Sequence, residues 1–258
     1  MSGFKLFLMN HVWFIRLLMC FVVITVLSTT IFLHRHLSHG AVRLAPRLAL
    51  CFQAFLAWLL GVNAAEWWVG HSIHHTFADR DGDPHSPWRF GFLWVLFGAV
   101  FAHKRAKLEH PELFAKLMAT YQPTLVDRVV ARLAIPGTGY ALNSFGFLGV
   151  VSFALFGWAV GHPWQGVLLW LINAACCLLF FGLVNCLGHW SAKKNRQGNH
   201  ATDLPWPLRL LLVGEGAHEA HHAHPRRAYY GWTDITGWCI RFLVWCGLGT
   251  LPTAPAKV

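Results

Sequence analysis

Nine histidines in this chain fall into four short groups, and each group stands at or just beyond the end of an apolar stretch. The groups are His34 with His39, His71 with His74 and His75, His189 alone, and His218 with His221 and His222. Imidazole is a common ligand of iron, zinc and copper. Nine imidazoles are too many for one metal ion and suit two. The chain must therefore fold so that four distant segments meet at one place.

The spacing within the groups indicates helices. In H-S-I-H-H and H-E-A-H-H the three histidines stand at positions i, i+3 and i+4, which share one face of an α-helix. His34 and His39 are five residues apart, which is off-face for a regular helix, so we expect the helix to loosen after Leu33. Asn185 stands four residues before His189, so its amide would either ligate a metal directly or hold a metal-bound water.

The composition is that of a protein surrounded by lipid. Of the 258 residues, 55% are hydrophobic and 12% are charged, whereas soluble domains carry about 25% charged residues. A helix needs roughly 20 apolar residues to cross a bilayer. We therefore expect an all-α integral membrane protein with about three transmembrane spans, at residues 12–33, 142–162 and 166–188.

The residues outside these spans, 34–141 and 189–258, are expected to form a histidine-rich cap, so that 1–258 make a single membrane-bound domain. Three further apolar runs are too short or too interrupted to cross the bilayer, and we expect interfacial or re-entrant helices at 48–62, 90–102 and 238–251. The first apolar run is too long for a cleavable signal peptide and ends in His34, so we expect it to remain in the mature protein.

The order of the spans places all nine histidines on one side of the membrane, because an even number of spans separates each group from the next. Of the 21 Lys and Arg residues, all but Lys5 and Arg16 fall on that same side. The positive-inside rule makes it the cytoplasmic side. We expect a bacterial inner-membrane protein whose site faces the cytoplasm. The net charge of +10 then reflects orientation and contact with anionic lipids or carriers, not nucleic acid.

The motifs resemble those of the integral-membrane fatty acyl desaturases, most closely the stearoyl-CoA type and its bacterial relatives. The matching stretches are H-R-H-L-S-H at 34–39, H-S-I-H-H at 71–75, D-P-H-S-P at 83–87, N-C-L-G-H at 185–189 and G-E-G-A-H-E-A-H-H-A-H-P at 214–225. The resemblance covers residues 12–240. It implies that the nine histidines hold a non-haem diiron centre, with Asn185 contacting one iron through water. It does not assign each histidine to a particular iron.

The resemblance also implies an activity: oxygen-dependent insertion of a double bond into a saturated acyl chain carried by CoA, by an acyl-carrier protein or by a lipid. The cofactor would be two iron ions, with molecular oxygen as co-substrate. The sequence holds no H-P-G-G haem segment and no iron–sulfur cysteine set, so we expect a separate electron donor such as ferredoxin or cytochrome b5, fed by an NAD(P)H reductase. Related diiron hydroxylases and acetylenases share the same motifs and remain an alternative.

Several groups beside the ligands are candidates to orient the imidazoles. We expect Asp83, His85, Glu215 and Glu219 in this role, and the carboxylates of Glu66, Asp79, Asp81 and Asp234 are further candidates. The family usually has four spans, and here one span precedes the first histidine group.

H-E-A-H-H also satisfies the zinc-peptidase pattern H-E-x-x-H. In that alternative His218 and His222 would bind zinc and Glu219 would be the general base. It leaves most of the nine histidines unexplained.

Overall fold

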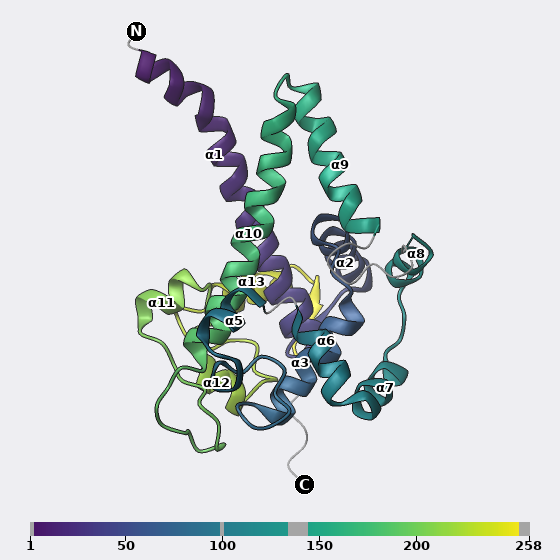
Figure 1. Cartoon of the computed structure of the whole chain (residues 1–258), viewed down its shortest axis with the longest axis vertical. Coiled ribbons are helices and arrows are strands. Elements are labelled where there is room, and N and C mark those ends of the chain that lie inside the picture. Colours follow the sequence, from purple (N-terminus) through teal and green to yellow (C-terminus); the bar gives the residue numbers. More distant parts are fainter. Residues whose placement is uncertain (1–2, 99–100, 134–143, 253–258) are drawn as a thin grey trace.

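The computed structural model describes residues 3–98, 101–133 and 144–252, and this part of the chain is almost entirely helical (Figure 1). The strands within it are one short antiparallel pair, in which Arg43 faces Thr250 and Leu44 faces Gly249. The elements in chain order are α1 (Gly3–Ser28), η1 (Thr29–Ser38), β1 (Arg43–Leu44), α2 (Pro46–Leu60), α3 (Ala64–Phe77), α4 (Pro87–Phe90), α5 (Phe92–Gly98), α6 (Ala102–Glu109), α7 (Pro111–Thr120), α8 (Leu125–Leu133), α9 (Ser144–Ala159), α10 (Pro163–Gly188), α11 (Trp206–Leu211), α12 (His218–Ala223), α13 (Ile235–Trp245) and β2 (Gly249–Thr250).

Among the described residues, two helical segments are long and apolar enough to cross a membrane. The first is Val12–Ser38, which joins α1 to η1 with a mean hydropathy of 2.3, and the second is Trp164–Gly188 of α10, with a mean hydropathy of 2.5. A third candidate is the pair α2 and α3, if a helix pair bent by 94° is counted as one broken span. The prediction of a helical membrane protein with about three spans is confirmed.

The expected second span corresponds to α9, a 16-residue helix that turns back into α10 (Figure 1). Residues 142 and 143, where that span was expected to begin, lie outside the described residues. The two helices touch closely, since a Cβ on Gly166 would collide with the carbonyl oxygen of Phe153. Small residues of this kind let helix backbones approach each other in a membrane.

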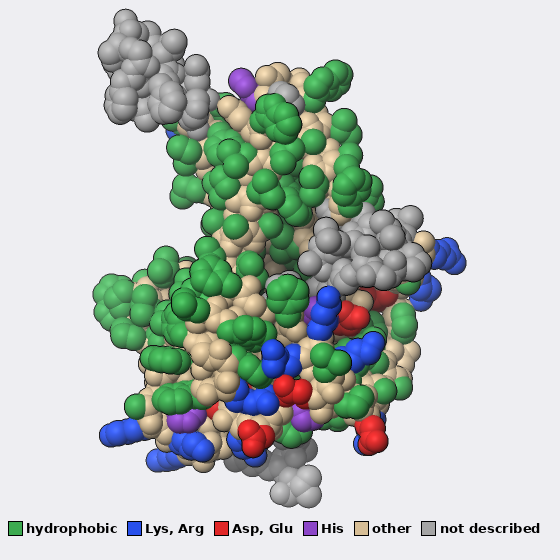
Figure 2. Space-filling view, in the orientation of Figure 1, with side chains coloured by type: hydrophobic (Ala, Val, Ile, Leu, Met, Phe, Trp, Pro, Cys, Tyr) green, Lys and Arg blue, Asp and Glu red, His purple; other side chains and the backbone are tan. Residues whose placement is uncertain are grey.

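The two ends of the molecule differ in chemistry. Apolar side chains cover the upper part, which contains α1, α9 and α10, while lysine and arginine side chains gather around the lower part (Figure 2). The lower part contains α3 to α8 and α11 to α13, which come from the residues for which the sequence predicts a cap. The short apolar run at 48–62 is helix α2, and the runs at 90–102 and 238–251 contribute to α4–α6 and α13.

A sharp turn between α2 and α3 aims the second histidine group at the first. Gly61 ends α2 in the left-handed conformation, with φ of +68°, and the side chain of Asn63 caps α3 by accepting a hydrogen bond from the Glu66 amide. Directly against η1 lies a buried apolar core that includes Leu33, Leu56 and Ile240. This core fixes the end of the first span, from which the first histidines project.

Candidate metal centre

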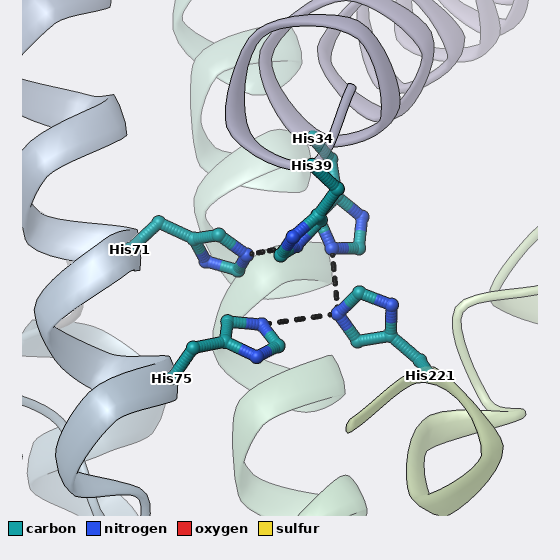
Figure 3. Close-up of side chains that lie close together, drawn as sticks. All are labelled: His34, His39, His71, His75 and His221. Atoms are coloured by element: carbon teal, nitrogen blue, oxygen red, sulfur yellow. Dashed lines mark hydrogen bonds between the residues drawn. The ribbon is translucent and has the colours of Figure 1, made fainter. Parts of the chain in front are cut away.

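Five histidines form the first group of candidate ligands (Figure 3). They are His34, His39, His71, His75 and His221, whose ligand nitrogens all lie within 4.8 Å of one another. The Nε2–Nε2 distances are 3.0 Å for His34 to His221, 2.9 Å for His39 to His71 and 3.1 Å for His75 to His221. Two nitrogens bound at right angles to one metal through bonds of about 2.1 Å lie about 3.0 Å apart. The five imidazoles therefore fit around a single ion.

Residues 29–38 form a π-helix, and this explains how His34 and His39 reach the same group. A π-helix bonds residue i to residue i+5, so residues five apart come to lie on one face. The amide of His39 donates to the carbonyl oxygen of His34 at 3.2 Å, and the Ser38 hydroxyl donates to the carbonyl oxygen of Leu33 at 2.8 Å. The expected loosening is present, although it begins at Thr29 rather than after Leu33.

Four histidines form the second group: His74, His189, His218 and His222. The Nε2 atoms of His189 and His218 lie 2.9 Å apart. The Nε2 atoms of His74 and His222 are buried and have no hydrogen-bond partner among the described residues. A buried imidazole nitrogen without a partner is costly unless it binds something, so the donor set suits a second ion.

Each histidine triplet divides between the two groups. On α3, His71 and His75 belong to the first group and His74 to the second, while on α12 His221 belongs to the first and His218 and His222 to the second. The sequence predicts that each triplet shares one face. It does not predict this division, which follows from two sites lying side by side beneath the helices.

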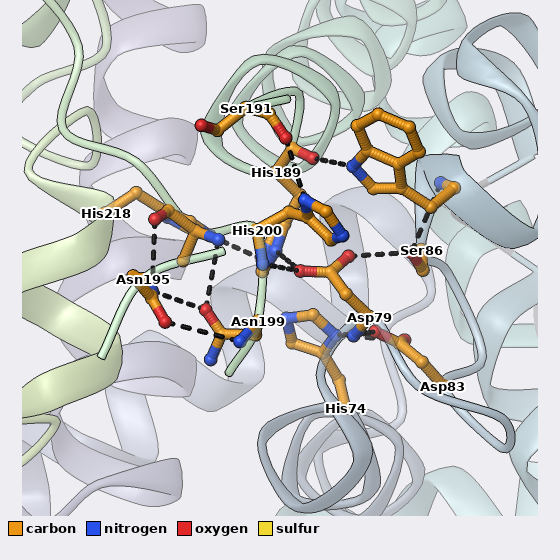
Figure 4. A network of polar contacts seen from close by, with 12 residues as sticks. His74, Asp79, Asp83, Ser86, His189, Ser191, Asn195, Asn199, His200 and His218 are labelled. Atoms are coloured by element: carbon orange, nitrogen blue, oxygen red, sulfur yellow. Dashed lines mark hydrogen bonds and ion pairs between the residues drawn. The ribbon is translucent and has the colours of Figure 1, made fainter. Parts of the chain in front are cut away.

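Three carboxylates hold the other ring nitrogen of three candidate ligands. Glu215 lies 2.8 Å from Nδ1 of His34, Asp83 lies 3.0 Å from Nδ1 of His74, and Asp79 lies 2.7 Å from Nδ1 of His189. Figure 4 shows the Asp79 and Asp83 contacts. A carboxylate on Nδ1 keeps the proton there and leaves the Nε2 lone pair free for a metal.

The electrostatics match this arrangement. Burial alone would raise the pKa of Glu215, but interactions with His34 and Arg35 lower that pKa to about 2. Burial would also raise the pKa of Asp79, and its hydrogen bond and charge interaction with His189 lower that pKa to about 2. Both carboxylates are therefore ionised at neutral pH.

The histidines of α12 shift in the direction that a metal site requires. Burial, followed by the neighbouring imidazoles, lowers the pKa of His218, His221 and His222 well below 6.5. The three rings are neutral at pH 7, and neutral imidazole is the form that binds metals.

Two further predicted residues lie next to the groups. His85 is buried and stacks on His74 with ring centroids 4.0 Å apart, and neither of its ring nitrogens has a hydrogen-bond partner among the described residues. Asn185 lines the same cavity as His218. Whether Asn185 reaches a metal through water stays a prediction.

Other predicted carboxylates lie elsewhere. Glu219 is half-buried, and among the described residues no hydrogen bond or ion pair joins it to a candidate ligand. Glu66 faces His103 at 3.7 Å, and Asp81 is exposed. Asp234 lies 3.4 Å from the guanidinium of Arg35. It therefore pairs with the residue next to His34 and not with a candidate ligand itself.

Sequence reasoning missed Arg35 and Tyr230. The Arg35 side chain is buried and pairs with Glu215 at 3.2 Å and with Asp234, while the Tyr230 hydroxyl lies 3.4 Å from Nδ1 of His221. The spacing H-R-H places Arg35 between two histidines, but nothing in the sequence indicates that its charge is buried.

A cavity of about 370 Å³ runs from the membrane part to the two groups. Trp170, Ala174 and Phe181 of α10 line its apolar part, and His34, His71 and His218 lie at its polar end; the other lining residues are Thr29, Leu33, Leu60, Val62, Trp67, Gly70, His85, Ala102, His103, Cys177, Leu178, Val184, Asn185 and Glu215. Along α10 the lining extends from Trp170 to Asn185, or about 22 Å at the rise of an α-helix. The cavity is long and mostly apolar, and it ends at the candidate metal centre.

The chain is similar to several curated plant enzymes. It is 28% identical to "Palmitoyl-monogalactosyldiacylglycerol delta-7 desaturase, chloroplastic" of Arabidopsis thaliana, a match covering 92% of this chain and 61% of that protein. It is 28% identical to "Acyl-CoA 5-desaturase AL21" of Anemone leveillei, covering 92% and 71%. It is 27% identical to "Delta-9 acyl-lipid desaturase 1" of Arabidopsis thaliana, covering 90% and 72%.

A family model described as "Fatty acid desaturase" matches residues 11–244, which include all nine histidines and nearly the whole chain. The two histidine groups, the carboxylates behind them and the apolar cavity fall within the matched range. The resemblance drawn from the motifs is confirmed, and the chain belongs to the fatty acid desaturase family.

Proposed function

We propose that the protein is an oxygen-dependent fatty acyl desaturase that uses a diiron centre. The observation that carries the proposal is the meeting of two histidine groups with the end of a long apolar cavity. The reaction takes one –CH2–CH2– unit, one O2, two electrons and two protons, and gives –CH=CH– and two waters. The acyl chain is carried by CoA, a carrier protein or a membrane lipid.

Two irons, when bound, supply the oxidant made from O2 that can break unactivated C–H bonds, which no side-chain acid or base can do. The five-histidine group would hold one iron. The four-histidine group would hold the other, with Asn185 placed to fix a water on it. Asp79, Asp83 and Glu215 keep their partner imidazoles in the tautomer that presents Nε2.

The cavity does the positioning. Its apolar walls on α10 would bind the methylene chain and exclude water, so that the methylenes to be oxidised lie at the end marked by His71 and His218. The number of methylenes between the carrier and this end would set the position of the double bond. The site would face the cytoplasm, because Lys and Arg side chains gather on the lower part of the molecule in the face that Figure 2 shows.

The zinc-peptidase alternative accounts for fewer of these contacts. His218 and His222 do fall in one group, but that group also contains His74 and His189, and among the described residues no hydrogen bond or ion pair joins Glu219 to them. A five-histidine group beside it has no part in a one-zinc peptidase. Both the geometry and the family favour desaturation.

The test is to express the chain in a host whose acyl chains are all saturated and to identify the lipid products by mass spectrometry. We expect a new double bond in the wild type and none with His222→Ala. His224→Ala is the matched control, because His224 lies in the same motif but is exposed and belongs to neither group. Hydroxylated or acetylenic products would assign the alternative chemistry, and an unchanged lipid profile would contradict the proposal.

A further inference from the structure

An aromatic cluster at the surface touches the second histidine group from outside. The indole N–H of Trp88 donates to the carbonyl oxygen of His189 at 2.8 Å. The Trp88 ring stacks on Trp190 with centroids 5.6 Å apart and on His200 with centroids 4.4 Å apart. Trp88 and Trp190 are 47% and 50% exposed. One residue therefore separates solvent from a candidate metal ligand.

A second connection joins the same cluster to the same ligand. The backbone N–H of His200 donates to Asp79 at 2.8 Å, and the same carboxylate oxygen of Asp79 lies 2.7 Å from Nδ1 of His189. Two short routes, one through Trp88 and one through His200 and Asp79, thus lead from the surface to His189.

The loop between Trp190 and His200 presents positive charge beside this cluster. Lys193, Lys194 and Arg196 are exposed, and residues 190–202 contain no Asp or Glu. The loop is held in shape at its base, where His200 Nδ1 lies 2.8 Å from the carbonyl oxygen of Ser191. The side-chain amide of Asn195 adds a bond to Ala201 at 3.1 Å. The cations therefore stand on an ordered loop, not a free tail.

This surface is separate from the acyl cavity. The lining of the cavity includes none of the aromatic residues of the cluster and none of the three loop cations. Other cations stand on α6 near the cavity. Burial raises the pKa of Glu66, and the charges of Lys107 and Lys104 oppose that rise. Ala102 and His103 of α6 line the cavity, whereas the loop cations lie outside its lining.

We propose that an acidic one-electron carrier protein docks on the surface formed by Trp88, Trp190, His200, Lys193, Lys194 and Arg196, and that its electrons enter through Trp88 and His200 to His189. The inference rests on the proposed function, which consumes two electrons per double bond. Two reduced carriers, O2, two protons and –CH2–CH2– give two oxidised carriers, two waters and –CH=CH–. The positive loop would steer the acidic partner, and the aromatic cluster would bring it within one residue of the metal centre.

The first test measures docking alone. An oxidised plant-type [2Fe–2S] ferredoxin with an acidic surface is titrated onto the iron-loaded full-length protein in detergent, at low and at high salt. We expect K193Q/K194Q/R196Q to weaken binding roughly tenfold at low salt and to flatten its salt dependence. The matched control is K116Q/R128Q/R132Q, which removes three exposed cations from α7 and α8. Equal dissociation constants for the two triple variants would overturn the docking surface.

The second test measures electron entry. Reduced ferredoxin is mixed with the iron-loaded protein, and its reoxidation is followed by absorbance. We expect Trp88→Leu to slow reoxidation several-fold even at ferredoxin concentrations that saturate binding, and Trp88→Phe, which keeps a ring but loses the indole N–H bonded to His189, to recover part of the rate. Reduction by dithionite should be the same in all three proteins. Two results would overturn the route: slower reduction of Trp88→Leu by dithionite, or reoxidation of ferredoxin by Trp88→Leu at the wild-type rate.

Both tests are run without acyl substrate, which separates the two proposals. If the protein accepts electrons at this surface but makes no double bond, the proposed function fails and the docking surface stands. If it makes a double bond while the two triple variants bind ferredoxin equally, the docking surface fails alone.

Discussion

At the scale of single residues, the site depends on pairs in which a carboxylate holds Nδ1 of an imidazole. His189 with Asp79, His74 with Asp83 and His34 with Glu215 are three such pairs. The sequence predicts the nine imidazoles as ligands, and these three carboxylates are among the seven that it offers as candidates to orient them. It does not indicate which carboxylate meets which ring, because those distances depend on loops whose turns bring distant residues together.

The pair of Asp79 and His189 predicts a specific loss of metal. Asp79→Asn keeps the size of the side chain but removes the charge that stabilises the Nδ1 proton, so we expect iron affinity to fall by about 10- to 100-fold. Iron retained after dialysis against graded chelator measures this. Asp81→Asn is the control, since Asp81 is exposed two residues away. Equal iron retention in the two variants would show that Asp79 has no such role.

The buried histidines predict how stability depends on pH. The pKa values of His218, His221 and His222 are lowered in the fold, so the unfolded chain binds more protons once the pH falls below about 6.5. The metal-free protein should therefore lose stability as the pH falls below about 6.5, by at most ~1 kcal/mol per pH unit for each ring that stays neutral in the fold. Asp79 and Glu215, with pKa values lowered to about 2, add to the loss below about pH 4.5. The free energy of unfolding is measured by denaturant titration. A value that does not change from pH 8 to pH 5 would contradict this prediction.

At the scale of helices, the apolar runs identify α1 and α10, and the i, i+3, i+4 spacing identifies α3 and α12. The ten-residue π-helix at Thr29–Ser38 is only partly predictable. The spacing of His34 and His39 demands a wider turn, but where that turn begins depends on packing against the core around Leu56 and Ile240. The 94° bend between α2 and α3 lies where Gly61 ends α2 and Asn63 caps α3, and the sequence indicates the turn but not its angle.

The bend predicts a cost at Gly61. Its φ of +68° is strained for a residue with a Cβ, so Gly61→Ala should destabilise the protein by about 1 kcal/mol or more. Gly61→Asn should cost less, because asparagine tolerates the left-handed region better. Thermal unfolding of the two variants in the same detergent tests this ordering. A less stable Asn variant would mean that space at the turn matters more than backbone conformation.

At the scale of the whole molecule, the two ends differ in chemistry, with apolar side chains over one and Lys and Arg side chains on the other, which supports the proposed orientation (Figures 1 and 2). The unequal distribution of Lys and Arg between the two ends can be predicted from the sequence, because it depends only on the order of the spans and on which loops are basic. The division of nine histidines into groups of five and four is not readable, since it depends on the relative placement of four segments in space.

The orientation predicts where a membrane-impermeant thiol reagent can reach. In a background with the seven native cysteines replaced by alanine, Lys194→Cys should be labelled in inverted membrane vesicles and protected in intact cells. His162→Cys, at the turn between α9 and α10, should show the reverse pattern. Labelling of both positions from the same side would contradict the orientation.

The metal content of the purified, active protein tests the central claim most directly. Two histidine groups predict close to two irons per chain and little zinc, with about one iron lost in His75→Ala or in His222→Ala, since each variant removes a ligand from a different group. A protein that carries a single zinc and no iron while it retains its activity would contradict the diiron centre.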